Sequence, residues 1–441
     1  MTPTAIGLTM FAGMLALMAL RVPIAAAMFV PGALGYWALS GDAALLNQLK
    51  GAPVARLSVY DLSVIPLFLL MGQFATQGGL SRDLFRAAAA FVGHVRGGLA
   101  MSAVLAAAAF GAVCGSSVAT SATITQVAYP EMRAHGYQGR LATAALASGG
   151  TLGILIPPSV PLVVYAILTE QNVAKLFAAA FVPGLIAMAG YLVVIAITCR
   201  LRPELAPAGE RQSGMQRVRA LVGIWPIVLI FVVVFGGIYG GVFSPTEGAA
   251  VGCIGTLLAG LARRELDRAG LVRSFLGTAE TSAMVFMIFL GADMMNAALA
   301  LTQMPAALAQ WVSHLPVDPL WVVAAVLLLY VALGCVMDEL SMLLLTIPVL
   351  FPAIMSLPLL GLGAEPKAIW FGILVLMTVG IGLVAPPVGL NVYVVNGLAR
   401  DVPMNETYKG VFPFLASDVL RLLALLLFPS ISLGLVRLLY G

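Results

Sequence analysis

Charged side chains are scarce in this 441-residue chain: Asp, Glu, Lys and Arg make up 10% of it, whereas 61% of the residues are hydrophobic. An ordinary soluble domain carries about 25% charged residues, so the composition excludes a soluble globular protein. Apolar runs recur from end to end, and each helical crossing of a bilayer needs roughly 20 apolar residues. We therefore expect an integral multi-pass protein with about ten to a dozen membrane helices, counting pieces that enter without crossing.

Several motifs are missing as well. No segment matches G-x-x-x-x-G-K-[ST], so nothing indicates an ATP-driven motor. The first apolar run lacks a basic leader and a cleavage site, so we expect a retained span and not a signal peptide. Solid apolar runs such as VVAAVLLLYVALG replace the strict alternation of a membrane β-barrel, which predicts an all-α fold. No C-x-x-C pair occurs, so we expect small buried thiols at Cys114, Cys199, Cys253 and Cys335.

Arginine is concentrated in two segments, with five between residues 200 and 219 and four between residues 263 and 273. By the positive-inside rule such segments lie in the cytoplasm. Two apolar spans separate them, joined by FSPTEG, in which Ser244, Pro245 and Glu247 have the pattern of a capped helix start. We expect Ser244 near the opposite face, and we interpret the arginines as topology signals and not as a ligand site.

A short charged segment, residues 78–98, is too polar and too short to cross the membrane. We expect Ser81 to cap a helix of about a dozen residues there, lying at the membrane interface as a connector. His94 falls at the end of this segment, and His135 and His314 also lie in or beside loops.

The most informative pattern is a duplication. Pro157 and Pro158 lie in GILIPPSVPLVVY, and Pro386 and Pro387 lie in GLVAPPVGLNVYVV, at a constant offset. Upstream of each pair comes an apolar run, a small-polar interruption and a second, shorter apolar run. The chain therefore contains two related units.

Proline lacks an amide proton and clashes with the preceding helical turn, so a helix must end before each Pro-Pro pair. Non-helical backbone at membrane depth is tolerated only where it is buried in protein or lines a cavity. The interruptions at residues 115–117 and 334–339 are expected to be tips of helical hairpins. Broken helices at matching places in two halves are the best sequence indication of a transporter's binding site.

A site at these breaks has no fixed cation, because Lys and Arg are absent from residues 97–132, 141–174, 320–366 and 368–399. Carbonyl and hydroxyl oxygens suit hard cations, and half-helix N-termini suit carboxylates. We therefore expect Na⁺ together with an organic anion. The polar side chains on offer are Ser116, Ser117, Thr120, Ser121, Ser148, Thr151, Ser159, Thr378 and Asn391.

Asp338 and Glu339 form the one acidic pair near the second interruption. A carboxylate within a long apolar stretch is costly and by default functional. We expect Asp338, or its neighbour, near a second ion or as a support for the second tip. The alternative is that Asp338 only caps the helix beginning at Leu340.

GSSVATSATITQVAYPEM, GTLGILIPPSVPLVVYA and GIGLVAPPVGLNVYVV together closely resemble the large membrane subunit of the tripartite ATP-independent periplasmic (TRAP) transporters, also called DctM-type permeases. The resemblance covers nearly the whole chain. It implies an elevator-type secondary transporter with two inverted repeats, two helical hairpins and two broken helices. It also implies a small four-helix membrane subunit, a periplasmic solute-binding protein, an organic-acid substrate and a sodium gradient, in the bacterial inner membrane.

The resemblance also implies two sodium sites and partners outside this chain. Some relatives carry the small subunit fused at the N-terminus, so we expect a separate small subunit here, and no nucleic-acid partner. The second tip has no serine pair, which leaves its ligands open. The first ion would lie among Ser116, Ser117, Thr120, Gly149, Gly150 and Thr151, and the second among Gly334, Asp338, Thr378 and Gly380.

The organic acid is expected at the breaks, near Ser116, Pro158, Ser159, Pro387 and Asn391. The expected domain division is scaffold 1–96, transport repeat 97–200, scaffold 201–318, transport repeat 319–400 and scaffold 401–441.

Two other functions remain as alternatives. One is a passive channel. The other is an intramembrane protease, since Gly115, Ser116 and Ser117 satisfy a loose G-x-S pattern, although serine chemistry needs a base within reach. Counterflow of labelled solute separates a carrier from a channel, and cleavage of a transmembrane peptide would support a protease.

Overall fold

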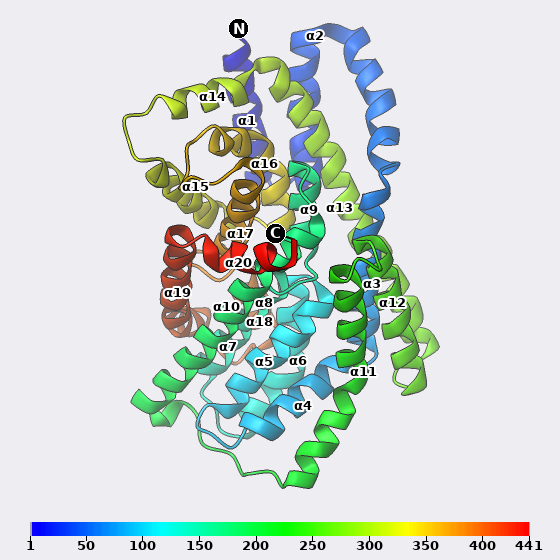
Figure 1. Ribbon diagram of the computed structural model, residues 1–441, viewed down its shortest axis with the longest axis vertical. Coiled ribbons are helices and arrows are strands. Elements are labelled where there is room, and N and C mark those ends of the chain that lie inside the picture. Colours follow the sequence, from blue (N-terminus) through cyan, green and yellow to red (C-terminus); the bar gives the residue numbers. More distant parts are fainter. Residues whose placement is uncertain (1, 441) are drawn as a thin grey trace.

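The computed structural model describes residues 2–440, which form helices and connecting loops (Figure 1). The first half contains α1 (Pro3–Ala19), α2 (Ile24–Leu57), η1 (Tyr60–Ser63), α3 (Val64–Gln77), α4 (Leu80–Val92), α5 (Gly98–Cys114), α6 (Ser117–Ala134), α7 (Gly139–Gly150), α8 (Leu152–Leu155), α9 (Val160–Thr169), α10 (Val173–Leu201) and η2 (Pro203–Leu205). The second half contains α11 (Gly214–Tyr239), α12 (Pro245–Ala262), α13 (Arg268–Thr302), α14 (Met304–Ser313), α15 (Pro319–Gly334), α16 (Glu339–Met355), α17 (Ala364–Gly382), α18 (Leu390–Leu398), α19 (Met404–Leu427) and α20 (Ser430–Tyr440).

Within residues 2–440, seven helices are long and apolar enough to cross a membrane, or up to nine if each of two bent pairs makes one span. One bent pair is η1–α3 with α4, and the other is α7–α8 with α9, bent by 41°. Five further apolar helices, including α5, α15 and α16, are shorter, with 10–17 residues each. The chain is thus an all-α, multi-pass membrane protein.

Local signals decide several helix ends. Ser244 caps α12 as predicted: its side chain accepts from the Glu247 amide, and Glu247 bonds back to the Ser244 amide. The prediction for Ser81 is wrong. Gly79, in a left-handed conformation, precedes α4, and Ser81 is buried inside the helix. Glycine turns the chain there without steric cost, so no side-chain cap is needed.

The four cysteines are buried and free, as expected. The three histidines lie at helix ends or in loops, also as expected.

Helices α2, α3, α11, α12 and α13 lie along one side of the molecule (Figure 1). The most extensive helix–helix interface is between α2 and α13, where Gly32 packs directly on the Met295 backbone. Arg56 of α2 binds Asp293 of α13 through both carboxylate oxygens. Asp293 therefore lies within a long helix and pairs with a residue that is distant in the sequence.

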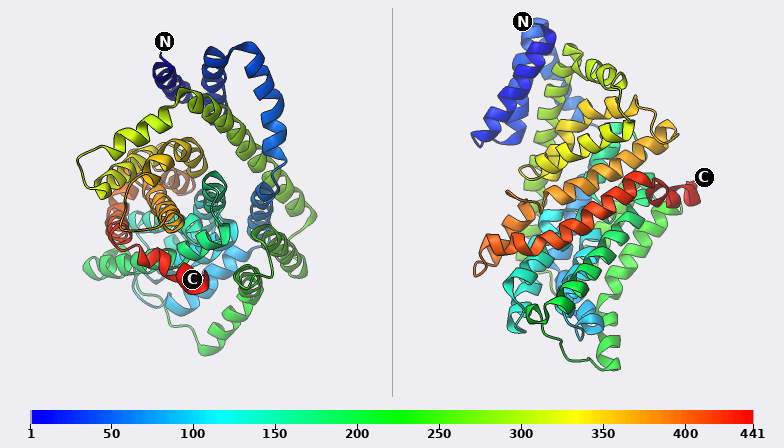
Figure 2. Two further views of the ribbon diagram at one scale, coloured as in Figure 1. Left: turned by 45° about the horizontal axis from the view of Figure 1, so that its top comes forward. Right: turned by 90° about the vertical axis from the view of Figure 1, so that its left-hand side faces the viewer.

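The two repeat units enter from opposite ends of the molecule. Hairpin α5–α6 begins at the end where segment 203–213 lies, whereas hairpin α15–α16 begins at the other end, near α14 (Figure 1). Both views of Figure 2 keep this order, with the yellow-to-orange hairpin nearer the N-terminus. The units therefore form an inverted repeat, as predicted.

The C-terminal helix α19 packs mainly on α7, α10, α17 and α18, which belong to the two repeat units. Asp401, in the loop between α18 and α19, binds Arg133 and Tyr129 of hairpin α5–α6. These contacts, the Tyr129 hydroxyl foremost, lower the pKa of the Asp401 carboxyl. The helix is thus tied to both repeats.

Candidate functional site

The first hairpin tip packs on the first break through glycines. A methyl group placed on Gly111 of α5 would lie 2.4 Å from the Gly153 Cα, so two backbones touch there. Beyond Pro158, the Val160 amide donates to the Gly115 carbonyl at 3.3 Å. The small-polar interruption and the Pro-Pro break, separate in the sequence, therefore form one structure.

The second unit repeats this arrangement. A methyl group on Gly382 would lie 2.6 Å from the Gly334 Cα, and the Gly389 amide donates to the Cys335 carbonyl at 3.2 Å. The Pro157–Pro158 and Pro386–Pro387 bonds are both cis. Each tip is thus paired with its own break, as the duplication predicts.

The two units also meet each other at the first tip. Asn391, which follows the second break, donates to the Ser117 hydroxyl at 2.6 Å and to the Ala147 carbonyl at 3.3 Å. Glu339, from the second tip, is 5% exposed and lies beside the Ser116 side chain and the Ser117 amide. The first tip is therefore contacted by both halves of the chain.

Buried oxygen atoms without hydrogen-bond partners gather on the elements around this tip. A polar group left unpaired on burial costs about 1–3 kcal/mol, so such a group in a native protein requires a reason. In the part of the chain that the structure describes, the unpaired atoms on these elements include Thr120 Oγ1, Ser121 Oγ, Ser148 Oγ, Asn391 Oδ1 and Glu339 Oε2.

Close packing joins these oxygens to the break. A methyl group on Gly150 would come within 2.8 Å of the Ser121 Cβ, and one on Gly153 would lie 2.6 Å from Thr120 Oγ1. Glycine is thus required where α7 and α8 cross α6. The first break and the hydroxyls of α6 share one interface, where hydroxyl, amide and carboxylate oxygens suit a hard cation.

Two half-helices begin beside this interface. Ser116 caps α6 by accepting from the Ala119 amide, and Ser159 caps α9 by accepting from the Leu162 amide, each at 3.5 Å. The N-terminal end of a helix favours anions. Pro158 and Ser159 are buried at the first break, so the solute residues predicted there lie close to the first tip.

Other predicted site residues have different surroundings. The Thr151 hydroxyl bonds to Ser148 and Tyr191, away from α6, and Gly149 faces α5. Gly380 lies against Thr151, with 3.6 Å between its projected Cβ and the Thr151 Cβ. The Thr378 hydroxyl donates to the Leu374 carbonyl at 2.7 Å within α17.

The second break is more open than the first. Pro387 is exposed, and its carbonyl accepts from the Tyr408 hydroxyl at 2.9 Å. Asp338 caps α16, accepting from the Leu340 and Ser341 amides at 3.2 Å each. The capping alternative for Asp338 is therefore present in the structure, and α16 begins one residue earlier than expected, at Glu339.

Sequence reasoning missed three buried residues behind the first break: Tyr191 of α10 and the ion pair Asp418–Arg421 of α19. Their signal in the sequence was DVLR, an acid and a base three residues apart in an apolar helix. Intramembrane charges of this kind are rare and costly, so the pattern carried information. The closeness of Glu339 to the first tip was missed too.

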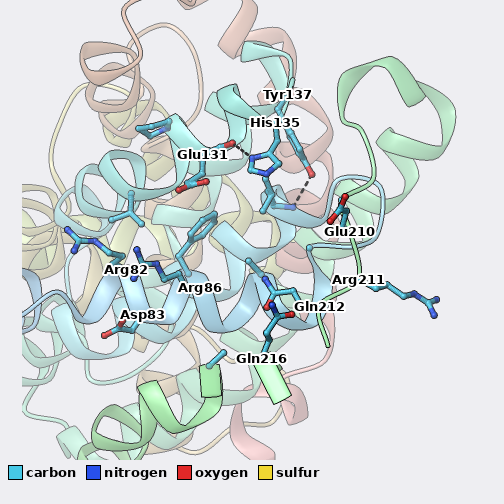
Figure 3. Close-up of a pocket in the computed structure, with 18 of the residues that line it drawn as sticks. Arg82, Asp83, Arg86, Glu131, His135, Tyr137, Glu210, Arg211, Gln212 and Gln216 are labelled. Atoms are coloured by element: carbon cyan, nitrogen blue, oxygen red, sulfur yellow. Dashed lines mark hydrogen bonds between the residues drawn. The ribbon is translucent and has the colours of Figure 1, made fainter. Parts of the chain in front are cut away.

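A cavity of about 1200 Å³ lies elsewhere, between α4, α6, residues 207–212 and α11. Figure 3 shows Arg82 and Arg86 of α4 below Glu131, His135 and Tyr137. Residues 207–212, which line this cavity, belong to the loop at the lower end of the molecule in Figure 1, and no tip or break residue lines the cavity. This cavity is thus separate from the interface at the first tip.

Comparison with known proteins agrees with this architecture. Residues 11–431 match the family model for the tripartite ATP-independent periplasmic transporter, DctM component. The chain is 35% identical over 379 residues to the C4-dicarboxylate TRAP transporter large permease protein DctM of Pseudomonas aeruginosa, covering 85% of this chain and 86% of the relative. It is 28% identical over 383 residues to the sialic acid TRAP transporter large permease protein SiaM of Vibrio cholerae, covering 87% of each chain.

A solved structure, the YdaH transporter of Alcanivorax borkumensis, is similar in fold. The TM-score is 0.64 at 16% identity, over 88% of this chain and 89% of that one.

The paired hairpins and broken helices define a membrane transporter built from two inverted repeats. The chain belongs to the DctM component family, the large permeases of TRAP transporters. Its relatives are permeases, which weighs against the intramembrane-protease alternative.

Proposed function

We propose that this chain is the large permease of a TRAP system that imports a small organic acid across the bacterial inner membrane, driven by sodium. A separate four-helix subunit and a periplasmic binding protein complete the system. The names of the relatives, which carry C4-dicarboxylate and sialic acid, support an organic acid as the substrate.

The observation that carries the sodium proposal is the group of unpaired buried oxygens around the first tip. No Lys or Arg lies in the sequence segments that form the tips and breaks. Glu339 therefore has no basic neighbour from those segments. A bound Na⁺ compensates the charge of Glu339 and is also coordinated by the oxygens of Thr120 and Asn391. A hard cation prefers such oxygen ligands.

The arrangement also supports coupling between ion and solute. The Ser116 and Ser159 half-helix starts favour a carboxylate, but the adjacent Glu339 carboxylate repels it. Sodium binding neutralises that repulsion, so the solute binds tightly only after the ion. Linked binding of this kind makes ion and solute move together.

A reconstitution experiment tests the whole proposal. We expect this chain with its small subunit, in sealed vesicles, to move little free organic acid under a sodium gradient. Adding the loaded binding protein outside should restore flux, because the site lacks fixed cations and captures free anion weakly. Equal accumulation by the chain alone would contradict the dependence on partners. Flux without counterflow of labelled solute would indicate a channel instead.

We also propose elevator movement, in which units 97–200 and 319–400, together with the helix α19 packed on them, travel as one body against residues 1–96 and 201–318. The units are in contact through Lys175 and Glu365, whose charged atoms lie 2.6 Å apart, and through Asn391 and Ser117. A cysteine pair at positions 175 and 365, once cross-linked, should leave uptake intact.

The matched cross-link joins a unit to the scaffold. Phe68 of α3 and Phe177 of α10 have ring centroids 6.3 Å apart, and a cysteine pair there, once cross-linked, should arrest uptake. Both variants are made in a background without the four native cysteines. Reducing the cross-link between positions 68 and 177 should restore uptake by the second variant. Arrest by the first link alone would show that the division into moving and static parts is wrong.

A further inference from the structure

The first break is attached to a buried ion pair of the C-terminal helix α19. Thr151 Oγ1 lies 3.0 Å from the Tyr191 hydroxyl, which donates to Asp418 Oδ2 at 3.0 Å. Asp418 in turn lies 2.8 Å from Arg421. These four residues, called here the Thr151–Arg421 chain, connect three elements: the α7–α8 junction, α10 and α19.

The Thr151–Arg421 chain is fully enclosed. Thr151, Tyr191 and Asp418 are 0% exposed and Arg421 is 6% exposed. The Arg421 guanidinium also lies over the Tyr191 ring, 5.8 Å from its centroid. A buried ion pair rarely adds net stability over apolar packing, because removing two charges from water is costly. Its presence behind the first break therefore points to a role other than stabilising the fold.

The direction of the hydrogen bond between Tyr191 and Asp418 in the Thr151–Arg421 chain follows from its donor and acceptor groups. An ionised carboxylate only accepts and a phenol carries one proton, so Tyr191 donates to Asp418. Tyr191 then has only lone pairs left for Thr151. Thr151 has a single hydroxyl proton, which it shares between the Tyr191 oxygen at 3.0 Å and the Ser148 carbonyl at 2.7 Å, so Thr151 joins the end of α7 to the α10–α19 side.

The Thr151–Arg421 chain and the first tip lie on opposite faces of the first break. Thr151 faces α10, whereas Gly150 and Gly153 face Ser121 and Thr120 of α6. A hydrogen bond on the side of the junction opposite α6 disfavours rotation of the junction away from α6. We propose that Tyr191, held by Asp418 and Arg421, is a positioning residue that keeps the α7–α8 backbone in register with the sodium ligands of the first tip. This inference rests on the sodium site proposed above.

The test is equilibrium binding of ²²Na⁺ to the purified full chain in lipid nanodiscs. Tyr191→Phe removes only the hydroxyl and keeps the packed ring. We expect the half-saturating sodium concentration to rise about fivefold, the scale of one buried hydrogen bond, with the number of bound ions unchanged. In a Thr151→Val background Tyr191→Phe should have no further effect, because Tyr191 acts through Thr151.

Tyr165→Phe is the matched control. Tyr165 is also 0% exposed, and its hydroxyl donates to the Ala368 carbonyl at 2.6 Å, away from the first break. It should bind sodium like the wild type even if its melting temperature falls as much as that of Tyr191→Phe. Identical sodium curves for the two variants would overturn the positioning role.

Two outcomes separate this inference from the proposed function. If the wild type binds sodium, Ser117→Ala weakens that binding and Tyr191→Phe does not, the site stands and the positioning role fails. If the wild type shows no saturable sodium binding, the proposed function fails, and the positioning role fails with it.

Discussion

Replacing both Ser116 and Ser117 by alanine is expected to lower sodium-driven uptake to below about one-tenth of the wild-type rate. Losing a hydroxyl that contacts a charged group, here the bound sodium ion, costs about 1.5–3 kcal/mol of binding free energy. A change of about 1.4 kcal/mol corresponds to a tenfold change in affinity. Ser117 also accepts the bond from Asn391 that joins the two units. Uptake is measured in vesicles containing the complete system, at low and high sodium.

Ser102→Ala is the control for this experiment. Ser102 lies on the same hairpin and is 0% exposed, but its hydroxyl donates within α5 to the Gly98 carbonyl at 2.7 Å. It should transport normally. The double variant should remain folded, because only two hydroxyl oxygens are removed and the apolar packing is kept. Near-normal uptake by the double variant at both sodium concentrations would exclude Ser116 and Ser117 from the ion site.

Glu339→Gln is expected to raise the half-saturating sodium concentration for uptake at least about tenfold. Glutamine keeps the size and an oxygen but removes the charge that faces the first tip, and a charged ligand contributes roughly 1.5–3 kcal/mol. The variant should be no less stable than the wild type, because it removes a buried carboxylate with an unpaired oxygen. Uptake is titrated with sodium, and thermal unfolding is followed in parallel.

Glu365→Gln provides the comparison for Glu339. Glu365 is half exposed and pairs with Lys175 at 2.6 Å, in the first turn of α17, at the opposite end of that helix from the second break. Surface pairs contribute about 0–1 kcal/mol, so its sodium dependence should not change. Glu339→Asp keeps the charge with a shorter reach and should fall between wild type and Glu339→Gln. If all three variants share one sodium curve, the ion is bound by neutral oxygens alone.

Local chemistry explains why the breaks and tips were predictable from the sequence. The Pro157–Pro158 and Pro386–Pro387 pairs end helices wherever they occur, since proline has no amide proton to donate. The start of α12 at Ser244 was predictable for the same kind of reason, because a capping box involves only four consecutive residues. Ser81 was mispredicted because Gly79, two residues earlier, already turns the chain.

The membrane class, the all-α fold, the duplication and the places where its helices break were thus determined by the sequence itself, through hydropathy and backbone chemistry that act within a few residues. Tertiary structure decided which oxygens face one another. Asn391 meets Ser117 across 274 positions, and Tyr191 meets Asp418 across 227. Such contacts depend on how whole helices pack, so no local pattern specified that α19 would support the first break or that Glu339 of the second tip would lie beside the first.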